Sequence, residues 1–208
     1  MTLPLNTIIC GDCLEVMKNL EDKSVDLVLT DPPYGIGIAH NPIRQMHEKM
    51  DWDNATPTSE YFSELFRISE NQIIWGGNFF DLPPTQCFLL WDKEQPETFS
   101  TSMCEQAWTS FKSPAKLFRY RVVDGVVKEH PTQKPLPLMV WCLEKYSNPG
   151  MTVLDPFMGS GTTCVACKKL GRNYIGIEKE PAYVTIAEKR LEKVNNHKIT
   201  DFFGACES

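Results

Sequence analysis

The chain has 208 residues, of which 42% are hydrophobic and 23% charged, and this ordinary globular composition excludes a disordered or fibrous protein. Its length predicts a single domain over residues 1–208. The formal net charge of −6 excludes a uniformly basic nucleic-acid-binding surface but allows a local basic patch. No apolar stretch is long enough to span a membrane, and residues 1–10 lack the pattern of a signal peptide, so we expect a cytosolic protein.

Eight cysteines in such a chain should be reduced thiols. Two Cys-x-x-Cys pairs occur, Cys10 with Cys13 and Cys164 with Cys167, but they lie about 150 residues apart and within apolar runs. We therefore interpret these cysteines as small hydrophobic residues of the core rather than zinc ligands, and we expect no metal site.

The first part of the chain predicts five strands, two helices and a ragged hairpin. The run over 25–30 is almost continuously apolar and ends at two prolines, which is typical of a strand buried on both faces. Between residues 35 and 57 the sequence is polar and aperiodic, which predicts a long loop. The predicted strands are 7–10, 25–30, 72–75, 87–91 and 105–111, the helices are 14–20 and 59–68, and the hairpin is 116–127 around Asp124-Gly125.

The last part of the chain alternates helices and strands before a tail over 198–208. The predicted helices are 138–146, 162–170 and 182–194, and the strands are 152–154 and 173–177. Such alternation predicts an α/β fold with a doubly wound, mostly parallel, Rossmann-like sheet.

Residues 155–162 (Asp-Pro-Phe-Met-Gly-Ser-Gly-Thr) follow a predicted strand and open a predicted helix. The glycines let the backbone approach a ligand closely, and the helix N-terminus presents free N–H groups. Glu178 ends the next strand, where a carboxylate can accept hydrogen bonds from a ribose diol. Cys164 replaces the third glycine of a dinucleotide-binding fingerprint, and no lysine follows Gly161 as a Walker loop requires. This pattern predicts a nucleoside site without phosphates; the alternative is a tight strand-to-helix turn with no ligand.

The position of this loop is also informative. Only 47 residues follow Gly161, so most of the sheet comes from the chain before it. In an ordinary dinucleotide-binding fold the glycine loop comes first, so the order of elements here is permuted.

A second candidate site is the motif Asp31-Pro32-Pro33-Tyr34, which ends the buried strand 25–30. Proline has no N–H and stiffens the backbone, which leaves nearby carbonyls free to accept from a ligand. A carboxylate, free carbonyls and an aromatic ring suit a planar ring that carries an exocyclic amine. The alternative is a Pro-Pro turn with Asp31 as a cap and Tyr34 as packing.

Together these motifs resemble the β-class DNA amino-methyltransferases, which use S-adenosylmethionine. The catalytic Asp-Pro-Pro-Tyr of that family matches residues 31–34, and its cofactor loop matches 155–162. His-Pro-Thr-Gln-Lys-Pro stands at 130–135, and Gly-Asp-Cys at 11–13 resembles the element that meets the cofactor adenine. The motifs cover nearly the whole chain in the β-class order.

The resemblance implies two groups of site residues. The catalytic residues are Asp31, Pro32, Pro33 and Tyr34. The cofactor-binding residues are Asp12, Cys13, Lys134, Asp155, Phe157, Gly159, Gly161, Thr162 and Glu178.

Two of these assignments have alternatives. Thr132 could cap a helix whose first turn carries Lys134, and the ammonium with free N–H groups would seat the methionine carboxylate of the cofactor; alternatively, the prolines only start a helix. Asp12 could bind adenine or be the N-cap of the helix 14–20.

The implied reaction is methylation of the N6 amine of an adenine flipped out of DNA. Hydrogen bonds from this poorly nucleophilic amine to Asp31 and the Pro32 carbonyl would localise its lone pair for direct attack on the sulfonium methyl, while Tyr34 stacks on the base. No proline is followed by cysteine, which excludes the Pro-Cys motif of cytosine C5 methylation. The preference for adenine rests on the resemblance. Cytosine N4, RNA, or a non-catalytic nucleoside-binding module remain alternatives.

Two segments are candidates for DNA contact. Residues 112–134 contain six basic and two acidic residues with interleaved aromatics, which suits a phosphate backbone or a solvated hairpin face. The loop 35–55 is expected to be mobile without DNA and to order over the flipped base. No separate recognition domain is evident, so we expect a short target site or help from a second subunit. The resemblance also implies that a homodimer is possible.

Overall fold

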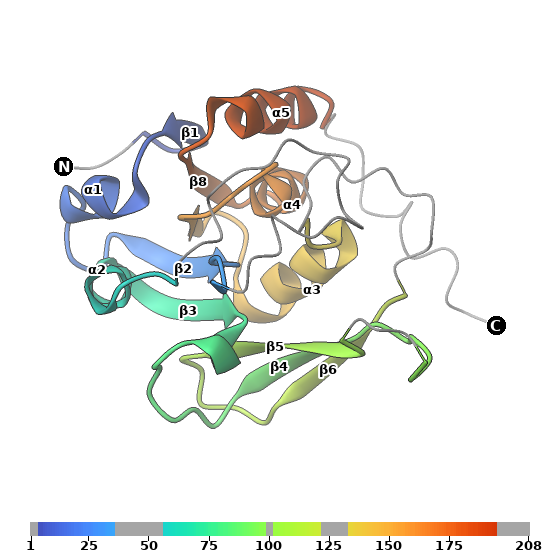
Figure 1. Cartoon of the computed structure of the whole chain (residues 1–208). Coiled ribbons are helices and arrows are strands. Elements are labelled where there is room, and N and C mark those ends of the chain that lie inside the picture. Colours follow the sequence, from blue (N-terminus) through green and yellow to red (C-terminus); the bar gives the residue numbers. More distant parts are fainter. Residues whose placement is uncertain (1–3, 36–55, 99–101, 122–132, 195–208) are drawn as a thin grey trace.

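The computed structural model describes residues 4–35, 56–98, 102–121 and 133–194, which form one eight-stranded sheet covered by helices (Figure 1). The strand order is β1-β8-β7-β2-β3-β5-β4-β6. All neighbouring strands pair in parallel except at β5, which is antiparallel to both β3 and β4. The strands are β1 (Thr7–Cys10), β2 (Val25–Thr30), β3 (Ser69–Trp75), β4 (Phe88–Asp92), β5 (Cys104–Thr109), β6 (Lys116–Arg119), β7 (Thr152–Asp155) and β8 (Asn173–Glu178).

Helices cover the two faces of this sheet in separate layers. One face packs against α1 and α2, and the other packs against α3, α4 and α5. The helices are α1 (Cys13–Lys18), α2 (Ser59–Ile68), α3 (Leu136–Tyr146), α4 (Thr162–Leu170) and α5 (Pro181–Glu192), with one short 3-10 turn, η3 (Gly77–Phe79). The predicted doubly wound, mostly parallel α/β fold is therefore confirmed.

Alternation along the central strands divides the core between these layers. Leu27 and Leu29 of β2 belong to the cluster under α3 and α4, whereas Val28 belongs to the cluster under α1 and α2. Each of these three side chains is at most 1% exposed. Since both faces of the strand are buried, its sequence is a nearly continuous apolar run rather than an alternating one.

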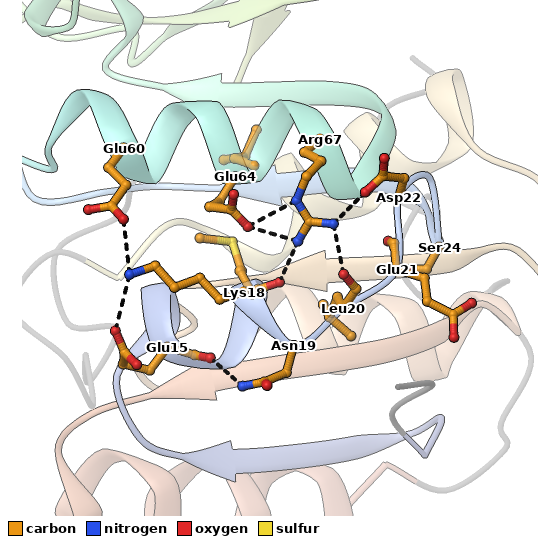
Figure 2. Close-up of polar contacts among 12 residues, drawn as sticks. Glu15, Lys18, Asn19, Leu20, Glu21, Asp22, Ser24, Glu60, Glu64 and Arg67 are labelled. Atoms are coloured by element: carbon orange, nitrogen blue, oxygen red, sulfur yellow. Dashed lines mark hydrogen bonds and ion pairs between the residues drawn. The ribbon is translucent and has the colours of Figure 1, made fainter.

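The short helix α1 depends on a side chain of α2 (Figure 2). The guanidinium of Arg67 donates to the carbonyl of Met17, in the last turn of α1, at 3.0 Å and to that of Leu20, just after the helix, at 2.8 Å. The same group pairs with Glu64 and Asp22 at 2.8 and 2.5 Å. A six-residue helix is not stable alone, so these contacts fix the place of α1 and of the loop after it.

The prediction of a hairpin over 116–127 is wrong for residues 116–119, the strand within the described part of this segment. Residues 116–119 form β6, which pairs in parallel with β4 at the edge of the sheet, with Leu117 opposite Leu90. The predicted turn at Asp124-Gly125, the loop over 36–55 and the tail over 198–208 lie outside the described residues.

The sheet order brings the two sequence motifs together. Strands β7 and β2 are parallel neighbours, with Leu154 opposite Val28, and β8 lies on the other side of β7. The loop over 155–162, the motif over 31–34 and Glu178 therefore follow three adjacent strands at the same edge of the sheet, where open α/β sheets bind their ligands.

Candidate functional site

A cavity of about 520 Å³ lies at this edge of the sheet. Its walls come from the loops after β1, β2, β7 and β8, from the start of α2 and from the segment before α3. This volume lies within the ~300–1,000 Å³ range of small-molecule sites. Predicted site residues that line it are Asp12, Cys13, Asp31, Pro33, Lys134, Asp155, Phe157, Gly159, Thr162 and Glu178.

The loop after β7 begins with a buried acid. Asp155 is 5% exposed, and its Oδ1 accepts from the Phe157 N–H at 3.2 Å. Burial raises the pKa of Asp155 to about 7, although the hydrogen bond opposes the rise. This carboxyl group is therefore close to the point of losing its proton at neutral pH.

Gly161 has a structural role in the same loop. It is the N-cap of α4 with φ of +78°, a conformation that side chains rarely adopt. A Cβ here would lie 2.7 Å from the Cβ of Ala187 on α5. Gly161 thus permits close packing of the loop against α5, and it is not among the residues that line the cavity.

Glu178 fixes the loop to the end of β8. One carboxylate oxygen accepts from the Gly159 N–H at 3.0 Å, and the other accepts from the Glu180 N–H at 2.8 Å. Burial raises the pKa of Glu178, and these hydrogen bonds oppose the rise. The carboxylate lines the cavity and its oxygens have further lone pairs that can accept from a ligand hydroxyl.

Asp12 is the N-cap of α1, and it also lines the cavity. Its Oδ1 accepts from the N–H groups of Leu14 and Glu15 at 2.9 and 3.3 Å, so the capping alternative is the role that the structure shows. Beside it, burial raises the pKa of Cys13 to about 12, so this residue presents a neutral thiol to the cavity.

Asp31 lies between two donors. Its Oδ1 accepts from the Tyr34 hydroxyl at 2.5 Å, and its Oδ2 accepts from the Lys134 ammonium at 2.5 Å. The side chain is 21% exposed and lines the cavity. Pro32 beside it is buried, whereas Pro33 lines the cavity.

The Tyr34 ring is held by the chain that follows β3. It stacks on Phe79 with ring centroids 4.7 Å apart and planes 13° apart. Gly76, with φ of +70°, lies against the ring, and a Cβ at this position would overlap it. The ring therefore has a fixed place between η3 and the carboxylate of Asp31.

A family model described as "DNA methylase", for enzymes of the N6 and N4 type, matches residues 86–189, half of the chain. The chain belongs to this family of DNA methylases. The resemblance to DNA amino-methyltransferases is thereby confirmed at the level of the family.

Curated relatives agree with this assignment to the DNA methylases. Type II methyltransferase M.HinfI of Haemophilus influenzae is 29% identical over 91% of this chain and 69% of its own length. Type II methyltransferase M.HpaI of Haemophilus parainfluenzae is 26% identical over 91% of this chain and 75% of its own.

Solved structures of methylases have the same fold. M1.HpyAVI in complex with SAM is 28% identical, with a TM-score of 0.59, over 89% of this chain and 98% of that one. The cytosine-N4-specific PvuII DNA methyltransferase has a TM-score of 0.63 at 17% identity, over 96% of this chain and 92% of that one, and shows a common fold.

Lys134 of this methylase does not lie where the sequence predicted. Helix α3 begins at Leu136 with Pro135 as its N-cap and no side-chain cap, so Lys134 precedes the helix and is not in its first turn. The residue is 8% exposed and lines the cavity, and its ammonium contacts Asp31. It is also not part of an exposed basic stripe over 112–134. Thr132 lies outside the described residues.

Sequence reasoning missed Glu105, Lys93 and Phe79. Glu105 is the second residue of β5, and its Oε2 lies 3.0 Å from the Lys134 ammonium. Its Oε1 lies 2.7 Å from the ammonium of Lys93, which follows β4. No motif marks either residue, because their part in the site depends on the antiparallel pairing of β5.

From the sequence we expect no metal site. No group of three or more His, Cys, Asp or Glu side chains placed to hold a metal ion occurs within residues 4–35, 56–98, 102–121 and 133–194. In this same part of the chain all seven cysteines are free, and no helix is long and apolar enough to cross a membrane.

Proposed function

We propose that this chain transfers a methyl group from S-adenosylmethionine to the N6 amine of adenine in DNA. The proposal rests on one observation: residues of both sequence motifs line the same cavity, with Asp31 on one wall and Glu178 on another. An amine acceptor and a ribose acceptor on the same cavity are what a nucleoside cofactor and an exocyclic amine require. The choice of adenine over cytosine rests on the aspartate at the head of the motif.

The lining of the cavity fits this cofactor. Glu178 is placed to accept from the ribose hydroxyls, and Asp12 and Cys13 line the wall after β1 where the cofactor adenine is expected. Phe157 offers an apolar surface beside them, with its ring centroid 5.2 Å from that of Tyr61. When bound, S-adenosylmethionine supplies a methyl group activated by the adjacent sulfonium.

The chain contributes acceptors for the target amine. An ionised Asp31 is acceptor-only, so a hydrogen bond from the amine to Asp31 is strengthened as the nitrogen gains positive charge. A second hydrogen bond to the Pro32 carbonyl would hold the amine in a tetrahedral geometry. The base must leave the duplex to reach this depth, and Tyr34 is the aromatic surface nearest to Asp31 on which it could stack.

The test is incubation with tritiated S-adenosylmethionine and unmethylated bacteriophage DNA or RNA of matched composition. Labelled nucleic acid is then digested to nucleosides and separated. We expect label in N6-methyldeoxyadenosine, from the DNA arm only. Label in N4-methylcytosine or in RNA would replace the adenine proposal, and no label in any arm, with cofactor binding intact, would favour a binding module.

A further inference from the structure

Four side chains of alternating charge, with the hydroxyl of Tyr34 at one end, form a line beside the cavity. The Tyr34 hydroxyl bonds Asp31, Asp31 bonds Lys134, Lys134 pairs with Glu105, and Glu105 pairs with Lys93. The last three contacts measure 2.5, 3.0 and 2.7 Å. The Lys93 ammonium also lies 5.2 Å from the centre of the Trp91 ring. This line of charges joins the proposed catalytic carboxylate to the residue that follows β4, along the same edge of the sheet.

The reversed direction of β5 brings Glu105 into this line. Because β5 is antiparallel to β3 and β4, its amino end lies at the edge where its neighbours have their carboxyl ends. Its first residues therefore stand beside the last residues of β4, with Glu105 opposite Trp91. A parallel strand at this position would present its carboxyl end instead.

The Lys134 ammonium lies among oxygen atoms of the site. It donates two hydrogen bonds, to Asp31 Oδ2 at 2.5 Å and to the Tyr34 hydroxyl at 3.3 Å. It also forms an ion pair with Glu105 Oε2 at 3.0 Å, although this buried oxygen accepts no hydrogen bond within the described residues. A methionine carboxylate would have to compete with these oxygens for the ammonium. This arrangement contradicts neither cofactor binding nor catalysis, but it makes Asp31 the first partner of Lys134.

We propose, on the basis of the proposed methyl transfer, that Glu105 is a positioning residue that holds Lys134 against Asp31, so that Lys134 serves as counter-ion to the catalytic carboxylate. Lys134 is 9% exposed and Glu105 23%, so the pair is largely removed from water. A flexible lysine side chain acquires one fixed position only when it is held from more than one side. Glu105 is the second carboxylate that contacts the ammonium, beside Asp31.

The positive charge of Lys134 offsets the two nearby carboxylates, Asp31 and Glu105. The groups that face Asp31 are Lys134, Glu105 and Tyr34, with Asp155 on the neighbouring strand β7. Burial raises the pKa of Asp31, and Lys134 opposes this rise. Burial alone would also raise the pKa of Glu105, but Lys134 and Lys93 lower it to about 2. Without Lys134, two poorly solvated carboxylates would face each other, and they would retain a proton together.

The experiment compares Glu105→Gln, Lys134→Met and the double variant in the full chain. Single-turnover methylation of unmethylated bacteriophage DNA is measured from pH 5.5 to 9 at saturating tritiated S-adenosylmethionine, and cofactor affinity is measured by calorimetry. We expect a loss of about tenfold in rate for Glu105→Gln and more for Lys134→Met, with cofactor affinity within about threefold. The acid limb of the Lys134→Met profile should move to higher pH.

The double variant gives the decisive comparison. Removal of the Glu105 charge should relieve the repulsion left by Lys134→Met, so we expect the double variant to be faster than Lys134→Met at pH 7. Lys134→Arg, which keeps the charge, should retain more activity than Lys134→Met and serves if the latter does not fold. The matched control is Glu188→Gln on the exposed face of α5, which should match wild type.

Three results would overturn the inference. One is a wild-type rate and pH profile for Glu105→Gln. Another is a more than tenfold loss of cofactor affinity in Lys134→Met with an unchanged rate at saturation, which would assign Lys134 to the methionine carboxylate. The third is a double variant no faster than Lys134→Met. Failure of the proposed function is distinct, since the wild-type protein would then leave the DNA unlabelled.

Discussion

At the scale of a single residue, substitutions of Asp31 test its proposed role in methyl transfer. Asp31→Ala removes an acceptor whose hydrogen bond strengthens as the target amine becomes cationic, so we expect a loss on the order of 100-fold or more in rate. Asp31→Asn keeps the shape but loses the charge, and should also be slow. Cofactor affinity should change less than about threefold in both. Single-turnover methylation beside a cofactor titration checks this; a near wild-type rate for Asp31→Ala would reduce the motif to a turn.

Glu178 tests the cofactor half of the site. Glu178→Ala should weaken cofactor binding by roughly 1–3 kcal/mol, because a charge-assisted hydrogen bond to ribose is lost. The change also frees the N–H groups of Gly159 and Glu180, so Glu178→Gln is the control that retains an acceptor for one of them. Calorimetry measures both variants. An affinity equal to wild type in Glu178→Ala would remove this residue from the cofactor site.

At the scale of elements, the turn between β3 and η3 supports the proposed catalytic motif over 31–34. Gly76→Ala would place a methyl group on the Tyr34 ring in a backbone conformation with φ of +70°, so the ring or the turn must move. We expect a loss of at least about tenfold in methylation rate, with cofactor affinity preserved. Gly150→Ala is a matched control, since its φ of +86° is similarly strained but no atom lies within 4 Å of the added carbon. Equal effects of the two substitutions would attribute the loss to backbone strain alone.

The elements also show what the sequence could and could not predict. Strand β2 was predicted with its observed limits, because burial on both faces makes its run of apolar residues distinctive. Strand β6 was assigned to a hairpin, because its pairing with β4 depends on a neighbour that no local pattern specifies. Likewise, Asp31 and Glu178 could be predicted from motifs at strand ends. Glu105 could not, because it reaches the site only through the direction of β5.

For the whole molecule, the raised pKa of Asp155 predicts how the free energy of unfolding depends on pH. Its pKa is about 7 in the folded protein, against an ordinary value of ~3.9 in the unfolded chain. Between these values the unfolded chain has released a proton that the folded protein still holds, so this residue lowers the free energy of unfolding as pH rises from ~4 to ~7. Asp155→Asn removes this loss.

The measurement is urea unfolding of the cofactor-free protein at pH 5 and pH 8. The difference in unfolding free energy, Asn variant minus wild type, should grow by roughly 2–3 kcal/mol between the two pH values, since one pKa unit corresponds to ~1.4 kcal/mol. Contributions of groups that do not interact with Asp155 cancel in this difference. A difference that stays constant with pH would contradict the burial of an ionisable Asp155.

The pairing of β1 with β8 has a consequence for how the chain is made. Thr7 lies opposite Ile175, so the first strand has no partner in the sheet until the ribosome has added residues 173–178. At ~5–20 residues per second, this strand waits roughly 10–30 s after its own synthesis. Conversely, β8 has an open edge whenever β1 is absent, and such an edge invites pairing with other molecules. An N-terminal truncation that removes β1 should therefore reduce the soluble yield even though it leaves the catalytic motif and the glycine loop intact.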